Sequence, residues 1–282
     1  ILFHAGFAAF NGGFIGVDVF FVISGFLITN IIINELNSDS FSLVNFYERR
    51  ARRILPALMM VMLICIPFTL IWFVPGDMEN FSKSLLSASL FYSNYQFWFE
   101  SGYFETASEL KPLIHTWSLS IEEQFYIFFP LLLILIWKIR INYIFILILI
   151  FFSLSFFLAQ WGAYNHPTAT FWLLPTRMWE LLLGVIISLY LFNKKFNPSK
   201  QQSQIFSLVG LCLILISTFY FDKTIPNPSV YTLLPTVGTA LLILYARPGT
   251  LLNVALSNKI LVKMGLISYS LYLFHQPIFA FL

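Results

Sequence analysis

Long apolar stretches alternate with short polar connections along almost the whole chain. A helix that crosses a membrane needs about 20 apolar residues, because each residue rises about 1.5 Å through about 30 Å of hydrocarbon. The pattern therefore predicts an all-α, polytopic transmembrane helix bundle of about nine to ten spans, with the first and last spans incomplete in this chain. The expected helices cover residues 1–10 (in part), 17–36, 54–75, 118–138, 141–160, 173–193, 204–221, 230–246 and 265–282.

The segment 83–99 decides how these spans are oriented. It is apolar but contains Ser, Asn, Tyr and Gln, so it could cross, re-enter or lie at the interface. If it does not cross, the segment 76–117, with five acidic residues and two lysines, lies on one side. The other side then holds Arg49, Arg50, Arg52, Arg53, Lys138, Arg140, Lys194, Lys195, Lys200, Arg247, Lys259 and Lys263. Because basic residues favour the cytoplasmic side, we prefer this arrangement, with the turn 11–16 outside.

Composition supports a membrane protein. The 282 residues are 59% hydrophobic and 10% charged, whereas a soluble domain has about 25% charged residues. The net charge of +3 does not indicate a nucleic-acid partner, because charge placement matters more than the sum in a membrane protein. Cys65 and Cys212 lie in apolar runs and are predicted to be neither a disulfide nor a metal pair. We expect no metal site.

Ionisable residues inside apolar segments are costly and are therefore functional candidates. These residues are His4, Asp18, Glu122, Glu123, Arg177, Glu180 and His275. A neutral His4 in the outer half of its helix could act as the general base for an alcohol, or it could only pack against a neighbour. Asp18 could cap its helix or orient His4.

Four further positions have two interpretations each. Glu122 can cap its helix and shares a face with Tyr126, four residues later. The adjacent Glu123 points to a different face, so one of the two acids could face a polar cavity. Arg177 and Glu180, three residues apart, can pair within one helix or face the same cavity as His4.

The stretch "FYERRARRILPAL" contains the densest positive charge. Arg50 and Arg53 lie one helical turn apart, so their guanidinium groups could grip phosphates with forked hydrogen bonds. The alternative is a cytoplasmic anchor that only fixes topology.

Six motifs occur in one order along nearly the whole chain: "FHAG", "GGFIGVDVFFVISGFLIT", "FYERRARRILPAL", "HTWSLSIEEQFYIFFPLLL", "RMWELLLG" and "SYSLYLFHQP". In this combination the chain resembles the acyltransferase 3 family of integral membrane O-acyltransferases. The resemblance implies transfer of an acyl group, usually acetyl, from cytoplasmic acyl-CoA to a hydroxyl. The acceptors implied are extracytoplasmic glycans such as O-antigen, exopolysaccharide or peptidoglycan.

The resemblance also implies roles for single residues. His4 matches the family's critical histidine, whose basic partner would lie before residue 1, and Asp18 matches the acid of the second motif. Arg50 and Arg53 match an Arg-x-x-Arg motif, and Ser118 with Glu122 match a Ser-x-x-x-Glu motif. We therefore expect His4, Asp18 and Glu122 to be catalytic and Arg50 and Arg53 to bind acyl-CoA. Ser118, Tyr126, Arg177, Glu180 and His275 are candidate cavity-lining residues.

Residues 1–282 are expected to form a single transmembrane acyltransferase domain, multi-pass in a bacterial inner membrane. We expect acyl-CoA as donor substrate, no bound cofactor, and membrane lipids and a glycan as partners. Some family members carry an SGNH-type esterase domain after the last helix, and none is present here. Direct transfer and an acyl-histidine intermediate are both compatible with the sequence.

The competing functions are a transporter or flippase of an anionic or lipid-linked substrate, a membrane sensor, and acylation of a small molecule or lipid on the same fold.

Overall fold

The computed structural model describes residues 1–101, 110–194 and 196–282, and every regular element in these ranges is helical. Lys195 and the acidic residues Glu105 and Glu109 lie outside the described residues. The α-helices are α1 (Gly16–Asn37), α2 (Leu43–Trp72), α3 (Pro75–Ser89), α4 (Ser93–Glu100), α5 (Thr116–Ile136), α6 (Ile141–Asn165), α7 (Pro167–Trp172), α8 (Leu174–Asn193), α9 (Lys200–Tyr220), α10 (Leu233–Tyr245), α11 (Leu251–Leu256) and α12 (Lys259–Phe281). Short 3-10 helices cover Ala8–Phe10, Gly13–Ile15 and Val230–Thr232.

The predicted all-α, multi-pass bundle is confirmed. Within the described ranges, six segments are long and apolar enough to cross a membrane: Gly13–Asn37, Leu43–Trp72, Thr116–Ile136, Ile141–Asn165, Pro167–Asn193 and Lys200–Tyr220. Helices α10 and α12 occupy the predicted segments 230–246 and 265–282, but neither belongs to this set of six. By length and composition the structure therefore supports fewer spans than the nine to ten predicted.

The predicted partial helix over residues 1–10 is wrong. This segment forms a turn followed by a single 3-10 turn at Ala8–Phe10. Gly6 has a φ of 77°, which lies in the left-handed region and cannot continue a right-handed helix. His4 therefore lies in a turn at the rim of the bundle, not on a transmembrane helix.

The segment 83–99 does not form one continuous helix. Helix α3 ends at Ser89, Phe91 has a φ of 54°, and α4 begins at Ser93. The 15 residues of α3 extend about 22 Å, which is less than the thickness of the hydrocarbon core. The break agrees with the prediction that this segment does not cross.

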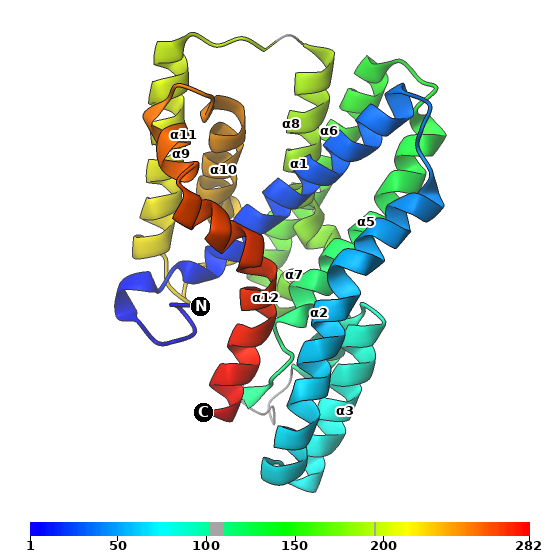
Figure 1. Ribbon diagram of the computed structural model, residues 1–282, viewed down its shortest axis with the longest axis vertical. Coiled ribbons are helices and arrows are strands. Elements are labelled where there is room, and N and C mark those ends of the chain that lie inside the picture. The colour runs from blue at the N-terminus through cyan, green and yellow to red at the C-terminus, as the bar shows by residue number, and fades with distance from the viewer. Residues whose placement is uncertain (102–109, 195) are drawn as a thin grey trace.

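Helices α1 and α8 form the tightest pair in the bundle, and α6 packs against the other side of α8 (Figure 1). A Cβ atom added at Gly25 of α1 would lie 2.0 Å from the carbonyl oxygen of Leu181 in α8. A Cβ at Gly184 would lie 2.1 Å from the carbonyl oxygen of Val22. Small residues let the two backbones approach each other, as they commonly do in membranes, where no hydrophobic force drives helices together.

The bundle has two chemically different ends. The connections α1–α2, α5–α6 and α8–α9 lie at the upper end in Figure 1, which we call the basic end, and α2–α3 lies at the opposite end. Arg50 lies near the start of α2 and Trp72 is its last residue. The intervening 22 residues rise about 33 Å, enough to cover the hydrocarbon thickness. Arg50 and Trp72 thus mark opposite faces of the membrane.

Candidate active site

A cavity of about 270 Å³ opens between the N-terminal turn, the start of α1, the segment before α5, and α12. It contains histidines, one ion pair and several aromatic rings, so it combines reactive groups with an apolar wall. The lining residues are Phe3, His4, Phe14, Val17, Asp18, Ile114, His115, Trp117, Phe171, Trp172, Arg177, Lys223, Asn227, Tyr272, His275 and Gln276. We call this space the histidine cavity.

Three imidazole rings meet in the histidine cavity. The ring centroid of His275 lies 5.2 Å from that of His4 and 5.4 Å from that of His115. The three rings come from the N-terminal turn, the residue before α5, and α12. Packing thus joins His4, from the first turn of the chain, to His275 near its end. In the described part of the chain, no group of three or more His, Cys, Asp or Glu residues is placed to hold a metal ion.

Our interpretation of the sequence missed His115. This residue is 5% exposed, and neither ring nitrogen makes a hydrogen bond of standard geometry with the described residues, although the Leu273 backbone lies close enough to favour the protonated ring. Burial, together with the nearby His275 and His4, lowers the pKa of His115 well below its ordinary value, so the ring is neutral at pH 7. A neutral imidazole has one donor and one acceptor nitrogen, and a buried unsatisfied polar group is costly. The sequence feature that could have identified His115 is its position in "HTWSL", three residues before Ser118.

A buried ion-pair network closes one side of the cavity. Arg177 Nη1 donates hydrogen bonds of 2.7 Å to Asp18 Oδ1 and 3.2 Å to Glu180 Oε1. Asn227 Nδ2 lies 3.5 Å from the other oxygen of Asp18. The guanidinium of Arg177 also lies over the rings of Trp117 and Phe171, at 5.2 and 4.9 Å from their centroids. These contacts fix the Arg177 side chain, because carboxylates bind its N–H groups and aromatic rings pack against the plane of its guanidinium.

The structure supports the pairing interpretation for both Arg177 and Glu180, and the cavity interpretation for Arg177. The two residues form the pair within α8, and Arg177 also reaches the cavity that contains His4. Glu180 lies behind Arg177 and is not among the described lining residues. Asp18 lines the cavity together with His4, with its carboxylate held by Arg177.

Glu122 lies in a second polar cluster, nearer the basic end. Ser24 and Tyr126 both donate hydrogen bonds to Glu122 Oε1. The guanidinium of Arg50 lies 5.6 Å from the ring centroid of Tyr126. Glu122 and Tyr126 are not among the described residues that line the histidine cavity. The structure therefore brings Glu122 together with Arg50, and not with His4 as the sequence suggested.

One polar stripe on α5 connects the two clusters. His115, Ser118, Glu122 and Tyr126 follow one another at spacings of three, four and four residues, so they share one side of the helix. The hydroxyls of Ser118 and Tyr272 are 2.6 Å apart, and Tyr272 donates a 2.5 Å hydrogen bond to the carbonyl oxygen of His115. The 11 residues from His115 to Tyr126 rise about 16 Å. The stripe leads from Arg50 to the histidine cavity.

Glu123 lies beside this stripe. It is 9% exposed, and its Oε1 has no hydrogen-bond partner among the described residues. As expected from their adjacency, Glu122 and Glu123 have different surroundings. The Arg50 and Arg53 side chains, on the first turns of α2, are more exposed than either acid.

Comparison with known proteins identifies the family. A family model described as an acyltransferase domain matches residues 1–282. The chain belongs to the acyltransferase 3 family. It is 33% identical over 296 residues to O-acetyltransferase OatA of Staphylococcus aureus, covering 100% of this chain and 48% of that protein. It is 29% identical to peptidoglycan O-acetyltransferase OatA of Listeria monocytogenes, covering 99% of this chain and 47% of that protein.

The chain thus spans about half the length of these two O-acetyltransferases. It is also 36% identical to an uncharacterized protein of Haemophilus influenzae, covering 80% of this chain and 96% of that protein. No solved structure gives a significant match. Family membership and the apolar helices show that the protein is a multi-pass membrane enzyme that transfers acyl groups.

Proposed function

We propose that this acyltransferase moves an acetyl group from cytoplasmic acetyl-CoA to a hydroxyl of an extracytoplasmic glycan, within a bacterial inner membrane. The observation that carries the proposal is the polar stripe on α5, which runs from the arginine end of the bundle to the histidine cavity. The relatives that are named O-acetyltransferase support acetyl as the group, and the peptidoglycan enzyme supports a glycan acceptor.

Arg50 and Arg53 are the proposed donor-binding residues. They lie near the start of α2 at the basic end, which the excess of Lys and Arg assigns to the cytoplasm. Forked guanidinium groups suit the phosphates of CoA. The neutral pantetheine arm would then extend along the Ser24, Glu122 and Tyr126 cluster toward His115.

His4 is the proposed general base. The acceptor hydroxyl gives its proton to His4 while its oxygen attacks the thioester carbonyl carbon, forming a C–O bond. The C–S bond then breaks, and the proton passes to the leaving thiolate of CoA. In the alternative course His4 itself accepts the acetyl group and hands it on. Asp18, which lines the same cavity and pairs with Arg177, would hold the charge of a protonated His4.

The developing oxyanion needs donors that are already in place. Arg177 and the neutral ring of His115 both line the cavity, and each carries N–H groups. Of the two, His115 is better placed to donate a hydrogen bond to the substrate, since its ring nitrogens make no hydrogen bond of standard geometry with the described residues. Ser118 and Tyr126, whose hydroxyls could also donate, are further along the stripe.

Transfer of labelled acetyl tests the proposal. The purified full-length protein is reconstituted into vesicles. Acetyl-CoA labelled in its acetyl group is supplied on one side of the membrane, and soluble peptidoglycan fragments are supplied on the other. Ester-linked label on the fragments is expected, and it should be lost with His4→Ala. Movement of the intact fragments or of CoA across the vesicle, without ester formation, would instead establish a transporter.

A further inference from the structure

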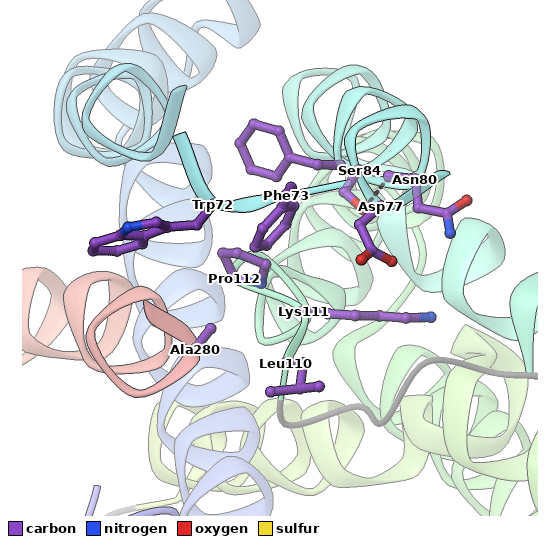
Figure 2. A pocket seen from close by; sticks show the side chains of 10 residues that line it. Trp72, Phe73, Asp77, Asn80, Ser84, Leu110, Lys111, Pro112 and Ala280 are labelled. Carbon is purple, nitrogen blue, oxygen red and sulfur yellow. Dashed lines mark hydrogen bonds between the residues drawn. The ribbon is translucent and has the colours of Figure 1, made fainter. Parts of the chain in front are cut away.

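A second cavity, of about 210 Å³, lies at the opposite end of the bundle from Arg50 (Figure 2). Its walls are the end of α2, one side of α3, the segment before α5 and the end of α12. In Figure 2 the Asp77, Asn80 and Lys111 side chains lie on one side of Phe73 and Pro112, and the Trp72 ring extends away from them on the other side. We call it the outer cavity.

The outer cavity and the histidine cavity are neighbours. Lys111 lines the outer cavity, and His115, four residues later, lines the histidine cavity. On α12, His275 lines the histidine cavity and Ala280 the outer one, a rise of about 7.5 Å. Gln276 Nε2 donates a hydrogen bond of 3.4 Å to the Lys111 carbonyl oxygen, which ties these two walls together. The segment before α5 and helix α12 thus line both spaces.

The chemistry of the outer cavity suits a sugar. Trp72, Phe73 and Pro112 supply apolar surface, with Trp72 55% exposed, and the Asp77 carboxylate and Asn80 amide supply hydrogen-bonding groups. A sugar unit presents the matching surfaces, an apolar C–H face and a rim of hydroxyls. Phosphate does not fit, because Lys111 is already paired with Glu100 at 2.8 Å and Asp77 adds a negative charge.

We propose that the outer cavity binds a sugar unit of the acceptor glycan next to the unit whose hydroxyl is acetylated. The proposal rests on the proposed function and extends it. The enzyme then discriminates between acceptors by chain length, because only an acceptor that is long enough fills both cavities. Short fragments then react through the histidine cavity alone.

An aromatic anchor at the membrane interface is the competing explanation of Trp72, whose ring lies 5.8 Å from that of Phe281. That role accounts for Trp72 but not for Asp77, Asn80 and Lys111 facing the same space. Asn80 is therefore the residue that distinguishes the two explanations, since it has no part in an aromatic anchor.

The test compares acceptors of different length. Peptidoglycan fragments of two and six sugar units are acetylated by the wild type, Asn80→Ala and Trp72→Ala. Each variant should lower kcat/KM on the longer fragment about fivefold to tenfold, mainly through KM, and leave the shorter fragment unchanged. This is the change expected for about 1 kcal/mol of lost contact. Glu79→Gln is the matched control on α3, since Glu79 is exposed and pairs with Lys83 in the next turn.

Equal losses on both fragments, or no loss on either, would overturn the proposal. If the wild type acetylates neither fragment, the proposed function fails. Calorimetric titration with the six-unit fragment then decides the subsite separately. Binding that Asn80→Ala weakens supports the outer cavity, and absence of binding to the wild type overturns it.

Discussion

Arg177 on α8 donates a 2.7 Å hydrogen bond to Asp18 on α1, a residue 159 positions earlier in the chain. Both side chains are at most 2% exposed, so neither charge is solvated by water. The pair joins the two most tightly packed helices at the wall of the histidine cavity. It therefore supports the fold and shapes the site at once.

Breaking this pair should be costly. Arg177→Met leaves the carboxylates of Asp18 and Glu180 without their cation, and removal of one partner of a buried pair typically costs about 3–5 kcal/mol. We expect a lower unfolding temperature in detergent and loss of acyl transfer. Arg247→Met is the control, because Arg247 contacts the Phe196 carbonyl at the basic end and pairs with no carboxylate of the described residues. An Arg177→Met protein as stable as the wild type would contradict this prediction.

His4→Ala should separate activity from stability. His4 is exposed and lies in a turn outside the helices, so its truncation should leave the unfolding temperature unchanged. Loss of a general base typically lowers the rate by about 10²–10⁴-fold. Initial rates and thermal unfolding on the same preparation check both statements. Full activity in His4→Ala would remove the residue from the mechanism.

Arg50→Ala with Arg53→Ala should weaken CoA binding at least tenfold, while binding of the acceptor glycan stays the same. Each lost charge-assisted hydrogen bond is worth about 1.5–3 kcal/mol. Arg52→Ala is the matched control, because Arg52 lies between them, is exposed, and pairs with Glu48 on the same helix. Titration calorimetry with CoA measures all three proteins. An unchanged affinity in the double variant would exclude this clamp.

His115→Phe should lower activity without lowering stability. The substitution keeps an aromatic ring and removes two buried nitrogens that make no hydrogen bond of standard geometry with the described residues, which is neutral or favourable for folding. If His115 binds the oxyanion, kcat should fall about 10²–10³-fold. Tyr272→Phe is the comparison, since it tests the neighbouring hydroxyl alone. A variant with normal kcat would show that His115 only fills space.

The same variant carries a prediction for pH. The pKa of His115 is lowered on folding, so the unfolded chain takes up a proton that the folded chain does not. The free energy of unfolding is therefore not reduced above the unfolded pKa, about 6.5, and it decreases as pH falls below that value. The unfolding temperature of the wild type should therefore fall more steeply below pH 6.5 than that of His115→Phe. Parallel curves for the two proteins would contradict the assignment.

The sequence allowed much of the fold to be predicted, because hydropathy follows the helices directly. It also contained the stripe on α5, whose polar residues recur at helical spacing. Residues 1–10 were misjudged, since a single left-handed glycine, Gly6, ends the helical conformation there. The break at Phe91 was foreseen only as an ambiguity over 83–99.

The site was harder to predict than the helices. Family motifs pointed to Arg50 and His4, and the spacing of four residues placed Glu122 beside Tyr126, but no spacing along the chain could show that this pair lies near Arg50 instead of His4. The meeting of His4 with His275 joins the two ends of the sequence and depends on how the whole bundle packs. His115 becomes noticeable only once its burial and its unpaired nitrogens are known.

The two ends of the bundle have a practical consequence for inhibition. Under the proposed orientation, the histidine cavity and the outer cavity open toward the cell exterior, while the donor enters past Arg50 from the cytoplasm. A compound that fills the outer space would not have to enter the cell or compete with the abundant intracellular CoA pool. Such a compound would also not be exposed to degradation in the cytoplasm.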